Sequence, residues 1–506
     1  NLKAFKKVDG EYTIVIISKL ETIIVRDKNG CGIPIYYNEN YFSNSFTDIL
    51  NLTKSKAIDK DSIKAFLNLG YIPSPNTPFI NIKKMSGGSF LYHRYHVSTI
   101  EGNLFDYEDF LKGVHKSVSS NDDKNDNKYE IFNTLLNEAT EKRIINKENI
   151  GVIDFQGFSK KLQKSNDFNY FLSDDSNSRI IKHHDIEILP EIISTFEIPF
   201  NDNNLIHNCI FIRKIKEANP DKLLVFEGIK YIFGTNASNI NKYFKLKRLK
   251  LLFLYKVIFK LLNLSLFNKN TRILPLRILI KRIIKLYSIE RGGFSKKELE
   301  KLIHNGSKKW VNNYRKSLPI KPLNFEEAYN VHNYFIDIRQ CLNEIEIFQF
   351  EKICEHYNID VSFPFLGNEI YDFIKTISLN EKAGGTVNNN KPYHNSSKNF
   401  INNLLKNTNY QSDYFLNINQ ASYLYDINLR KKLYNYILNA DATNQLLNKK
   451  MIVSFTEKIE KEMISNKINN KSLMSLSFHF FNLLILNLWW DIFINNKKGK
   501  SLKDFY

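Results

Sequence analysis

Two stretches near the start of the chain alternate between apolar and polar residues. Residues 11–17 and 21–27 contain many β-branched side chains, which pack well on the surface of a sheet. Two such runs with a short turn between them are typical of paired strands. Residues 33–37 have a similar composition and predict one more strand beside the pair. The first part of the chain is therefore expected to form a small sheet.

Helical spacing replaces this alternation at residues 62–69. The apolar residues recur at intervals of three and four, so they lie on one face of a helix. Gly70 follows directly, and then come Pro73, Pro75 and Pro78. Because proline fixes φ and donates no backbone hydrogen bond, regular structure is expected to stop there. The helix is therefore predicted to run into a rigid elbow.

The rest of the chain alternates between predicted helices and short apolar strands. The run 117–127 is rich in Ser, Asn and Asp, and a solvated linker is expected over residues 98–127. Helical spacing over residues 128–146 precedes a predicted strand at 150–154. Residues 476–494 are apolar with helical spacing, which predicts a packed closing helix. Together these elements predict an α/β fold.

Composition limits the classes of protein that fit. The chain has 506 residues, of which 43% are hydrophobic, enough for two or three domains with sizeable cores. Its four cysteines have neither the spacing of a zinc site nor the density of a disulfide framework, so no metal site is expected. We see no signal segment and no run of 18 apolar residues, so we expect a cytoplasmic protein.

The chain is basic, with a formal net charge of +19. This favours an anionic partner or surface, although a compositional bias toward Lys and Asn would give the same charge. Residues 240–291 are predicted to form basic amphipathic helices. These helices either bury an apolar face in the core or lie in a partner's groove or on the inner membrane surface. No nucleic-acid-binding motif is recognised, and no specific nucleic acid partner is expected.

Two sets of residues resemble the asparagine synthetase family, whose members are glutamine-dependent. The first set lies around the second and third predicted strands: Arg26, Asp27, Gly32, Pro34, Tyr36 and Tyr37. The second set lies in the elbow: Tyr71, Pro73, Pro75, Thr77, Ile82 and Lys84. The resemblance implies an N-terminal-nucleophile-type α+β domain. It also implies a following synthetase-like domain whose parallel sheet is of the kind that binds an adenine nucleotide.

In the resembled family the first domain carries an N-terminal cysteine, which needs a thiol beside its own α-amine. Asn1 offers neither a thiol nor a hydroxyl. Two explanations stay open: the native protein has residues before Asn1, or it has no glutaminase. With either explanation, residues 1–97 are expected to be a partial glutaminase-like domain that serves only as a scaffold.

The family's first nucleotide motif is a strand followed by Ser-Gly-Gly-x-Asp-Ser, a loop that holds the pyrophosphate of ATP. Residues 155–160 correspond to it and read Phe-Gln-Gly-Phe-Ser-Lys. One glycine, Gly157, is retained, while Gln156 places a side chain where the backbone must approach phosphate. The nucleotide-binding candidates of this degenerate loop are Gly157, Ser159 and Lys160.

The family's second nucleotide motif, Ser-Gly-Glu-Gly-x-Asp-Glu, corresponds to residues 225–231, which read Val-Phe-Glu-Gly-Ile-Lys-Tyr. Glu227 is retained and is the candidate catalytic residue. Gly228 is also retained and joins the nucleotide-binding candidates. Lys230 and Tyr231 replace carboxylates, which removes magnesium ligands and adds a charge that repels the metal.

The resemblance extends over nearly the whole chain. Two later segments also match family motifs: Glu197, Pro199, Phe200 and Asp202 in one, and Pro364, Phe365 and Leu366 in the other. The expected division is a partial glutaminase-like domain and elbow at 1–97, a linker at 98–127, and an asparagine-synthetase-like domain at 128–506. The residues that build the family's fold are thus kept, while those that perform its chemistry are largely lost.

Two hypotheses follow. The first is a pseudoenzyme of the ATP-pyrophosphatase fold that needs no cofactor and serves as a structural or regulatory subunit. Its partner would be an active paralogue or a biosynthetic assembly, bound through residues 240–291. The alternative is an enzyme that uses ATP and magnesium to form amide bonds, like asparagine synthetase or a peptide or lactam cyclase, with a rebuilt site. That alternative needs acidic residues from elsewhere, for which the candidates are Asp154, Asp174, Asp175 and Asp202.

Overall fold

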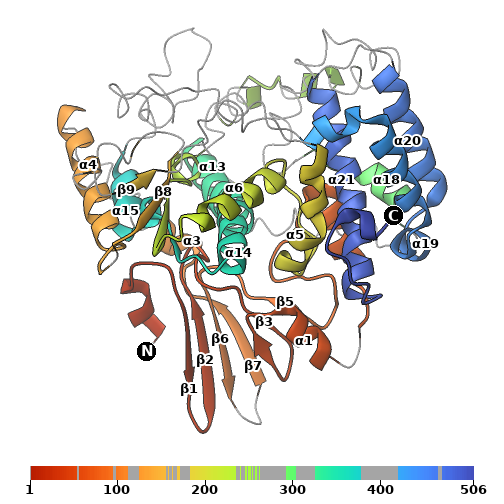
Figure 1. Ribbon diagram of the computed structural model, residues 1–506. Helices are drawn as coiled ribbons and strands as arrows, with labels where there is room; N and C mark the ends of the chain where they lie inside the picture. The colour runs from red at the N-terminus through yellow and green to blue at the C-terminus, as the bar shows by residue number, and fades with distance from the viewer. Residues whose placement is uncertain are drawn as a thin grey trace.

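The structure is a computed structural model of the 506-residue chain. It describes the following residues: 2–53, 56–94, 98–111, 125–146, 148–154, 158, 162, 168–170, 183–234, 240, 246–247, 249–251, 253–254, 257–258, 261, 292–303, 325–377, 420–464 and 470–506. Figure 1 shows strands from the first part of the chain at the bottom of the molecule, with the helices above them.

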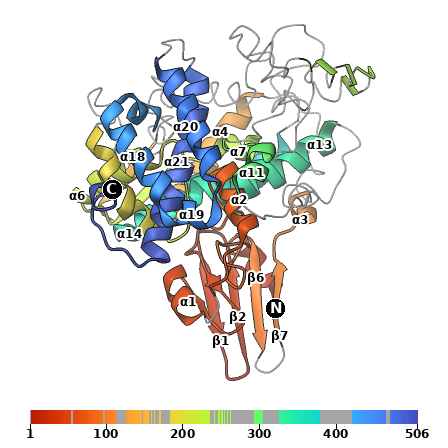
Figure 2. The same cartoon turned by 90° about the vertical axis from the view of Figure 1, so that its right-hand side faces the viewer.

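The largest antiparallel sheet has the strand order β1-β2-β6-β7. Its strands are β1 (Thr13–Ile17), β2 (Glu21–Arg26), β6 (Ser89–Arg94) and β7 (Ser98–Asn103). The predicted strand pair at 11–27 is confirmed, since Thr13 pairs with Arg26 and Ile17 with Thr22. Figure 2 shows this sheet projecting away from the helices. The last three residues of β1, Val15, Ile16 and Ile17, are exposed, so the end of the hairpin β1–β2 is uncovered on both faces of the sheet.

The linker expected at 98–127 does not begin where we predicted. Ser98–Asn103 forms β7 and pairs with β6 along its whole length, so the sheet continues to Asn103. A short helix, α3 (Tyr107–Leu111), follows, and α4 (Asn125–Glu141) begins before the expected residue 128. Residues 112–124 lie outside the described part of the chain. The boundary was placed too early because β7 carries only one large apolar residue, Ile100.

A second small sheet has the order β4-β3-β5 and sits beside two helices. Its strands are β3 (Tyr36–Tyr37), β4 (Phe42–Ser43) and β5 (Lys83–Lys84), and the helices are α1 (Phe46–Leu52) and α2 (Lys60–Leu69). A short helix, η1 (Leu2–Lys7), precedes β1. The Asp59 side chain caps α2 at its start by accepting a bond from the Asp61 N–H. Gly70 ends α2 with φ of 82°, a conformation that favours glycine. The predicted helix and its stop are therefore confirmed.

A parallel sheet with the order β11-β10-β8-β9 forms the centre of the second part of the chain. Its strands are β8 (Ile150–Ile153), β9 (Phe168–Tyr170), β10 (Lys222–Val225) and β11 (Val361–Ser362). In Figure 1, α4 and α15 (Asn368–Thr376) lie on one side of β8, and α6 (Leu205–Glu217) and α14 (Phe348–His356) lie on the other. The strand predicted at 150–154 is confirmed by β8.

Helices make up most of the remaining described structure. They are η5 (His183–Ile188), α5 (Leu189–Phe196), α7 (Ile229–Phe233), α11 (Lys296–Leu302), α13 (Phe325–His332), the π-type helix η7 (Asn333–Ile347), η8 (Pro364–Leu366), η9 (Gln420–Tyr425), α18 (Ile427–Asn439), α19 (Asp441–Leu446), α20 (Lys449–Ile464), α21 (Asn470–Phe493) and η10 (Leu502–Asp504). The fold is mixed α/β, as the sequence predicts.

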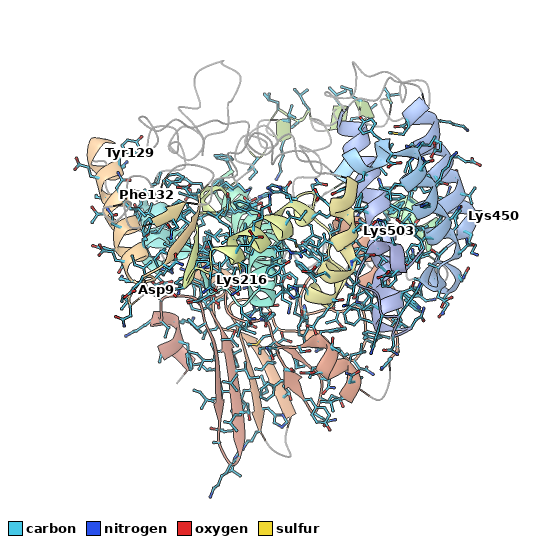
Figure 3. The ribbon with its side chains drawn as sticks, viewed as in Figure 1. Asp9, Tyr129, Phe132, Lys216, Lys450 and Lys503 are labelled. Atoms are coloured by element: carbon cyan, nitrogen blue, oxygen red, sulfur yellow. The ribbon has the colours of Figure 1, made fainter. Side chains whose placement is uncertain are left out.

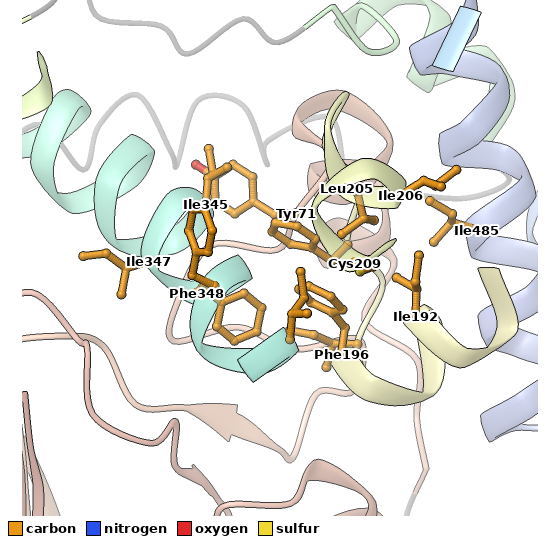
Figure 4. Packing of buried hydrophobic residues seen from close by; sticks show 14 of the residues in the cluster. Tyr71, Ile192, Phe196, Leu205, Ile206, Cys209, Ile345, Ile347, Phe348 and Ile485 are labelled. Atoms are coloured by element: carbon orange, nitrogen blue, oxygen red, sulfur yellow. The ribbon is translucent and has the colours of Figure 1, made fainter. Parts of the chain in front are cut away.

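One apolar core joins the elbow, the parallel sheet and the closing helix. Figure 4 shows Tyr71 of the elbow among Phe348, Cys209 and Phe196, which come from α14, α6 and α5. The predicted closing helix is α21. Its segment 475–493 is long and apolar enough to span a membrane, but 83% of the apolar window is buried inside the protein. That burial is typical of a core helix in a globular protein.

Most of the predicted basic helices at 240–291 lie outside the described residues. The described apolar side chains of this segment between residues 249 and 261 are exposed, with Phe253 at 71% and Leu249 at 63%. For these side chains, the alternative that they are buried in the core is wrong.

Candidate functional site at the carboxyl edge of the parallel sheet

Glu227 stands where strand β10 gives way to helix α7. The chain turns at Gly228, whose φ is 103°, a value that side chains other than glycine rarely adopt. A Cβ atom on Gly228 would approach Leu342 Cδ1 to 3.0 Å. The turn fixes Glu227 at the carboxyl edge of the sheet, where ligands of parallel sheets usually bind.

The carboxyl group of Glu227 is buried and only partly satisfied. The residue is 5% exposed, and its Oε1 has no hydrogen-bond partner among the described residues. Burial raises the pKa of Glu227 to about 7, with further raising by Glu346 and Asp154, while Lys230 and the Gly228 N–H act in the opposite direction. Near neutral pH both the protonated and the ionised form of the Glu227 carboxyl group are therefore populated.

Lys230 and Tyr231, which replace two carboxylates of the resembled motif, both meet Glu346 of η7. Lys230 Nζ lies 3.4 Å from Glu346 Oε1, and the Tyr231 hydroxyl donates to the same oxygen at 2.6 Å. Burial alone would lower the pKa of Lys230, but Glu346 and Glu227 raise it above its ordinary value. Lys230 is therefore a protonated cation whose charge is balanced inside the protein.

Sequence reasoning missed Glu346. The residue lies 116 positions after Lys230 in a helix that is otherwise largely apolar. No local motif marks it. The one available signal was the pair Lys230 and Tyr231, because a partly buried cation favours an opposite charge from some other element.

Asp154 ends β8 on the same edge and is 3% exposed. It acts on Glu227 electrostatically, so two of the acidic groups considered by sequence reasoning do come near one another. Asp202, just before α6, raises the pKa of Lys230 through its negative charge. Even so, the described residues contain no group of three or more His, Cys, Asp or Glu side chains arranged to hold a metal ion.

Aromatic rings fill the edge beside Asp154 and Glu227. Phe365 contacts Phe158 at 5.0 Å between ring centroids and Phe226 at 5.6 Å, both edge to face. Phe132 of α4, labelled in Figure 3, packs on the same group with its centroid 6.3 Å from that of Phe365. We call Phe132, Phe158, Phe226 and Phe365 the aromatic cluster. All four are at most 2% exposed.

The predicted nucleotide-binding residues divide into two groups. Gly228 is described and forms the turn after β10. Gly157, Ser159 and Lys160 lie outside the described residues, as do Asp174 and Asp175. Of the loop that corresponds to the first nucleotide motif, Phe158 alone is described, and it belongs to the aromatic cluster.

The first part of the chain has a recognisable relative among known families. Residues 2–102 match the family model of the glutamine amidotransferase domain. They form a glutamine amidotransferase-like domain. The match ends one residue before the end of β7, which agrees with the extent of the antiparallel sheet. No curated protein matches the chain.

A rigid loop follows β2 in the amidotransferase-like domain. The Arg26 guanidinium donates to the backbone oxygens of Gly30 and Gly32 at 2.7 and 2.8 Å, and Asp27 accepts the N–H groups of Cys31 and Gly32. Cys31 is 3% exposed, and burial and Asp27 raise the pKa of its thiol well above the ordinary range. A buried protonated thiol is a poor nucleophile. Cys31 is a packing residue of this loop.

The amidotransferase-like domain is bound tightly to the parallel-sheet part. Glu11 accepts from Arg143 Nε at 2.9 Å and from the Phe363 N–H at 3.0 Å, and so links the domain to the carboxyl end of β11. Lys84 and Glu344 form a largely buried ion pair at 2.7 Å. These links place the scaffold directly beside the candidate site.

Proposed function

We propose that this chain is an asparagine-synthetase-like protein that has lost ATP-dependent catalysis and acts as a structural or regulatory subunit of a complex. The observation that carries the proposal is the aromatic cluster at the carboxyl edge of the parallel sheet. Phe226 stands where the resembled motif has glycine, and it packs at 0% exposure against Phe365. Buried rings occupy the edge at which such a sheet normally leaves room for a ligand.

Charge supports the same proposal. The cation Lys230 is balanced by Glu346, so it is not available as a free partner for phosphate. Magnesium prefers carboxylate and water oxygens in octahedral geometry. The described residues offer it no three-carboxylate group and place Lys230 beside Glu227. They therefore do not fit a magnesium–pyrophosphate site, and we derive no catalytic step through one.

The partner in this proposal is a protein, either an active paralogue or a biosynthetic assembly. The segment 240–291 is the proposed contact. Its described side chains support this because exposed Leu249 lies beside Lys250 in the sequence, and exposed Phe253 follows in an apolar run. Exposed apolar side chains with a basic rim are typical of protein-binding surfaces.

Calorimetric titration of the purified chain with ATP and magnesium tests the loss of nucleotide binding. We expect no heat of binding up to millimolar ATP. A matched variant, Phe226→Gly, restores the glycine of the resembled motif and shows whether the ring alone blocks the site. Micromolar binding of ATP by the unmodified chain would contradict the proposal.

A second candidate is an ATP-dependent amide-forming enzyme with a rebuilt site, and the state of Glu227 favours it. The unpartnered Oε1 and the pKa of about 7 suit a group that accepts a proton from an attacking amine. Residues outside the described part of the chain would have to supply the metal ligands. If ATP and magnesium bind, Glu227→Gln separates the roles: a catalytic base loses turnover with binding unchanged, whereas a structural residue leaves both unchanged.

A further inference from the structure

A cavity of about 410 Å³ lies between the loop after β2 and helices α3, η7 and α15. Its size is in the range of small-molecule sites. Cations from four different segments line it: Lys6, Lys28, Arg339 and Lys375. Neither the match over residues 2–102 nor the proposed function assigns a role to this cavity.

Lys28 is one of the cations of this cavity, and an amide and an aromatic ring hold its side chain. Its Nζ donates to Asn368 Oδ1 at 2.5 Å and lies 3.9 Å from the centroid of the Tyr371 ring. Within the described part of the chain it makes no ion pair. By contrast, Asp109 pairs with Lys6, and Asp372 pairs with Lys375 at 3.2 Å.

Lys28 and Lys375, two of the lysines that line the cavity, repel each other. Burial lowers the pKa of Lys28 to about 7, and Lys375 lowers it further, while Asp9, Asp372 and Asp27 act in the opposite direction. The nearby carboxylates favour the ammonium form of Lys28, but they do not offset its burial and the charge of Lys375. An anion that entered the cavity would stabilise the ammonium form further.

Aromatic side chains also line this cavity. The Phe110 and Tyr334 rings lie 5.3 Å apart between centroids, and Tyr371 underlies the Lys28 ammonium. Tyr334 is fixed by a hydrogen bond of 2.9 Å to the Phe105 oxygen, and Tyr371 by one of 2.7 Å to Asn29 Oδ1. Both hydroxyl groups are thus held in place, and both rings line the cavity.

We propose that this cavity binds a small anion that carries an aromatic ring, with the anionic group held between Lys28 and Lys375 and the ring against Phe110 and Tyr334. Charge-assisted hydrogen bonds from two ammonium groups give the affinity for the anion. The rings give preference for a flat body over a bare ion. The site belongs to both parts of the chain, because Lys28 comes from the amidotransferase-like domain and Lys375 from α15.

Phenyl phosphate is the test probe, and calorimetric titration of the full chain is the measurement. We expect binding that Lys28→Met weakens at least about tenfold, since a hydrogen bond to a charged group is lost. Lys375→Met should weaken it similarly. Lys142→Met is the matched control. Lys142 is an exposed lysine that pairs with Glu369, a residue of the helix α15 that also carries Lys375. This substitution should leave the affinity unchanged.

Two further ligands separate the parts of the proposal. Benzyl alcohol has the ring without the charge, and inorganic phosphate has the charge without the ring, so both should bind more weakly than phenyl phosphate. Circular dichroism melting of each variant shows whether it is folded, and a variant that does not fold is replaced in the comparison by the other lysine variant. Equal binding of phenyl phosphate by the unmodified chain and both lysine variants, or no binding at millimolar concentration, would overturn the proposal.

Discussion

Replacing Glu227 by glutamine should stabilise the protein, and more so at high pH than at low pH. The pKa of Glu227 is raised from its ordinary value of 4.5 to about 7, mainly by burial. The folded state therefore holds a proton that the unfolded state releases between these two values. Stability falls as the pH rises through this window, and above pH 7 the cost is fully present.

The magnitude follows from the two pKa values. A difference of about 2.5 pH units at about 1.4 kcal/mol each gives a cost of roughly 3 kcal/mol at pH 8 and about 1 kcal/mol at pH 5. Glu227→Gln keeps the size of the side chain and removes the charge. Because Glu227 is 5% exposed, solvent screening reduces this cost little. The variant should therefore gain roughly 2 kcal/mol more at pH 8 than at pH 5.

Denaturant unfolding of both proteins at pH 5 and pH 8 measures this difference, with tryptophan fluorescence and circular dichroism followed together. Glu346→Gln is the matched control. It removes the partner of Lys230 from the same site, so it should destabilise the protein at pH 8. A gain for Glu227→Gln that is the same at both pH values would refute the assignment of the raised pKa to this carboxyl group.

Three other variants test the scaffold by thermal or denaturant unfolding. Gly70→Ala should destabilise the protein by about 2 kcal/mol or more, because φ is 82° and a Cβ would lie 2.5 Å from the Asn201 oxygen; unchanged stability would contradict this geometry. Glu197→Ala should cost about 1–2 kcal/mol, because its carboxylate accepts the first N–H groups of α1; Glu197→Gln, which keeps the acceptor oxygen, should cost less. Arg430→Lys should lower the melting temperature. The planar guanidinium group of Arg430 donates two hydrogen bonds to the Glu460 carboxylate, both at 2.7 Å, and a lysine ammonium group cannot reproduce this paired geometry. An unchanged melting temperature would show that one contact suffices.

Local patterns predicted the parts of the fold that depend on local chemistry. The alternation at 11–27, the capped helix before Gly70 and the apolar runs of β8 and β10 each have a period or a stop signal that a short window contains. Strand β7 was missed because it is exposed at the edge of its sheet. An edge strand needs few apolar residues, so its pattern resembles that of a linker.

The candidate site was predictable only in part. Glu227 and Gly228 could be found because a strand, a turn and a short helix follow one another directly in sequence. Glu346 and the packing of Phe158 against Phe365 depend on elements more than one hundred residues apart, which no local window contains. The cavity around Lys28 is also formed by distant segments, and nothing in its local sequence distinguishes that lysine from a solvated one.

The buried pair of Lys84 and Glu344 has a consequence for how the two parts of the chain can evolve. Without the amidotransferase-like domain, Glu344 and Arg143 would lose their partners Lys84 and Glu11, and water would hydrate both charges. The loss would also expose apolar side chains of the remaining part, because Phe46 and Phe66 of the domain belong to the same buried core as Trp489. A gene that lost the domain would therefore encode a less stable remainder. Selection for folding alone is enough to preserve that domain, so its persistence carries no information about whether glutamine is its substrate.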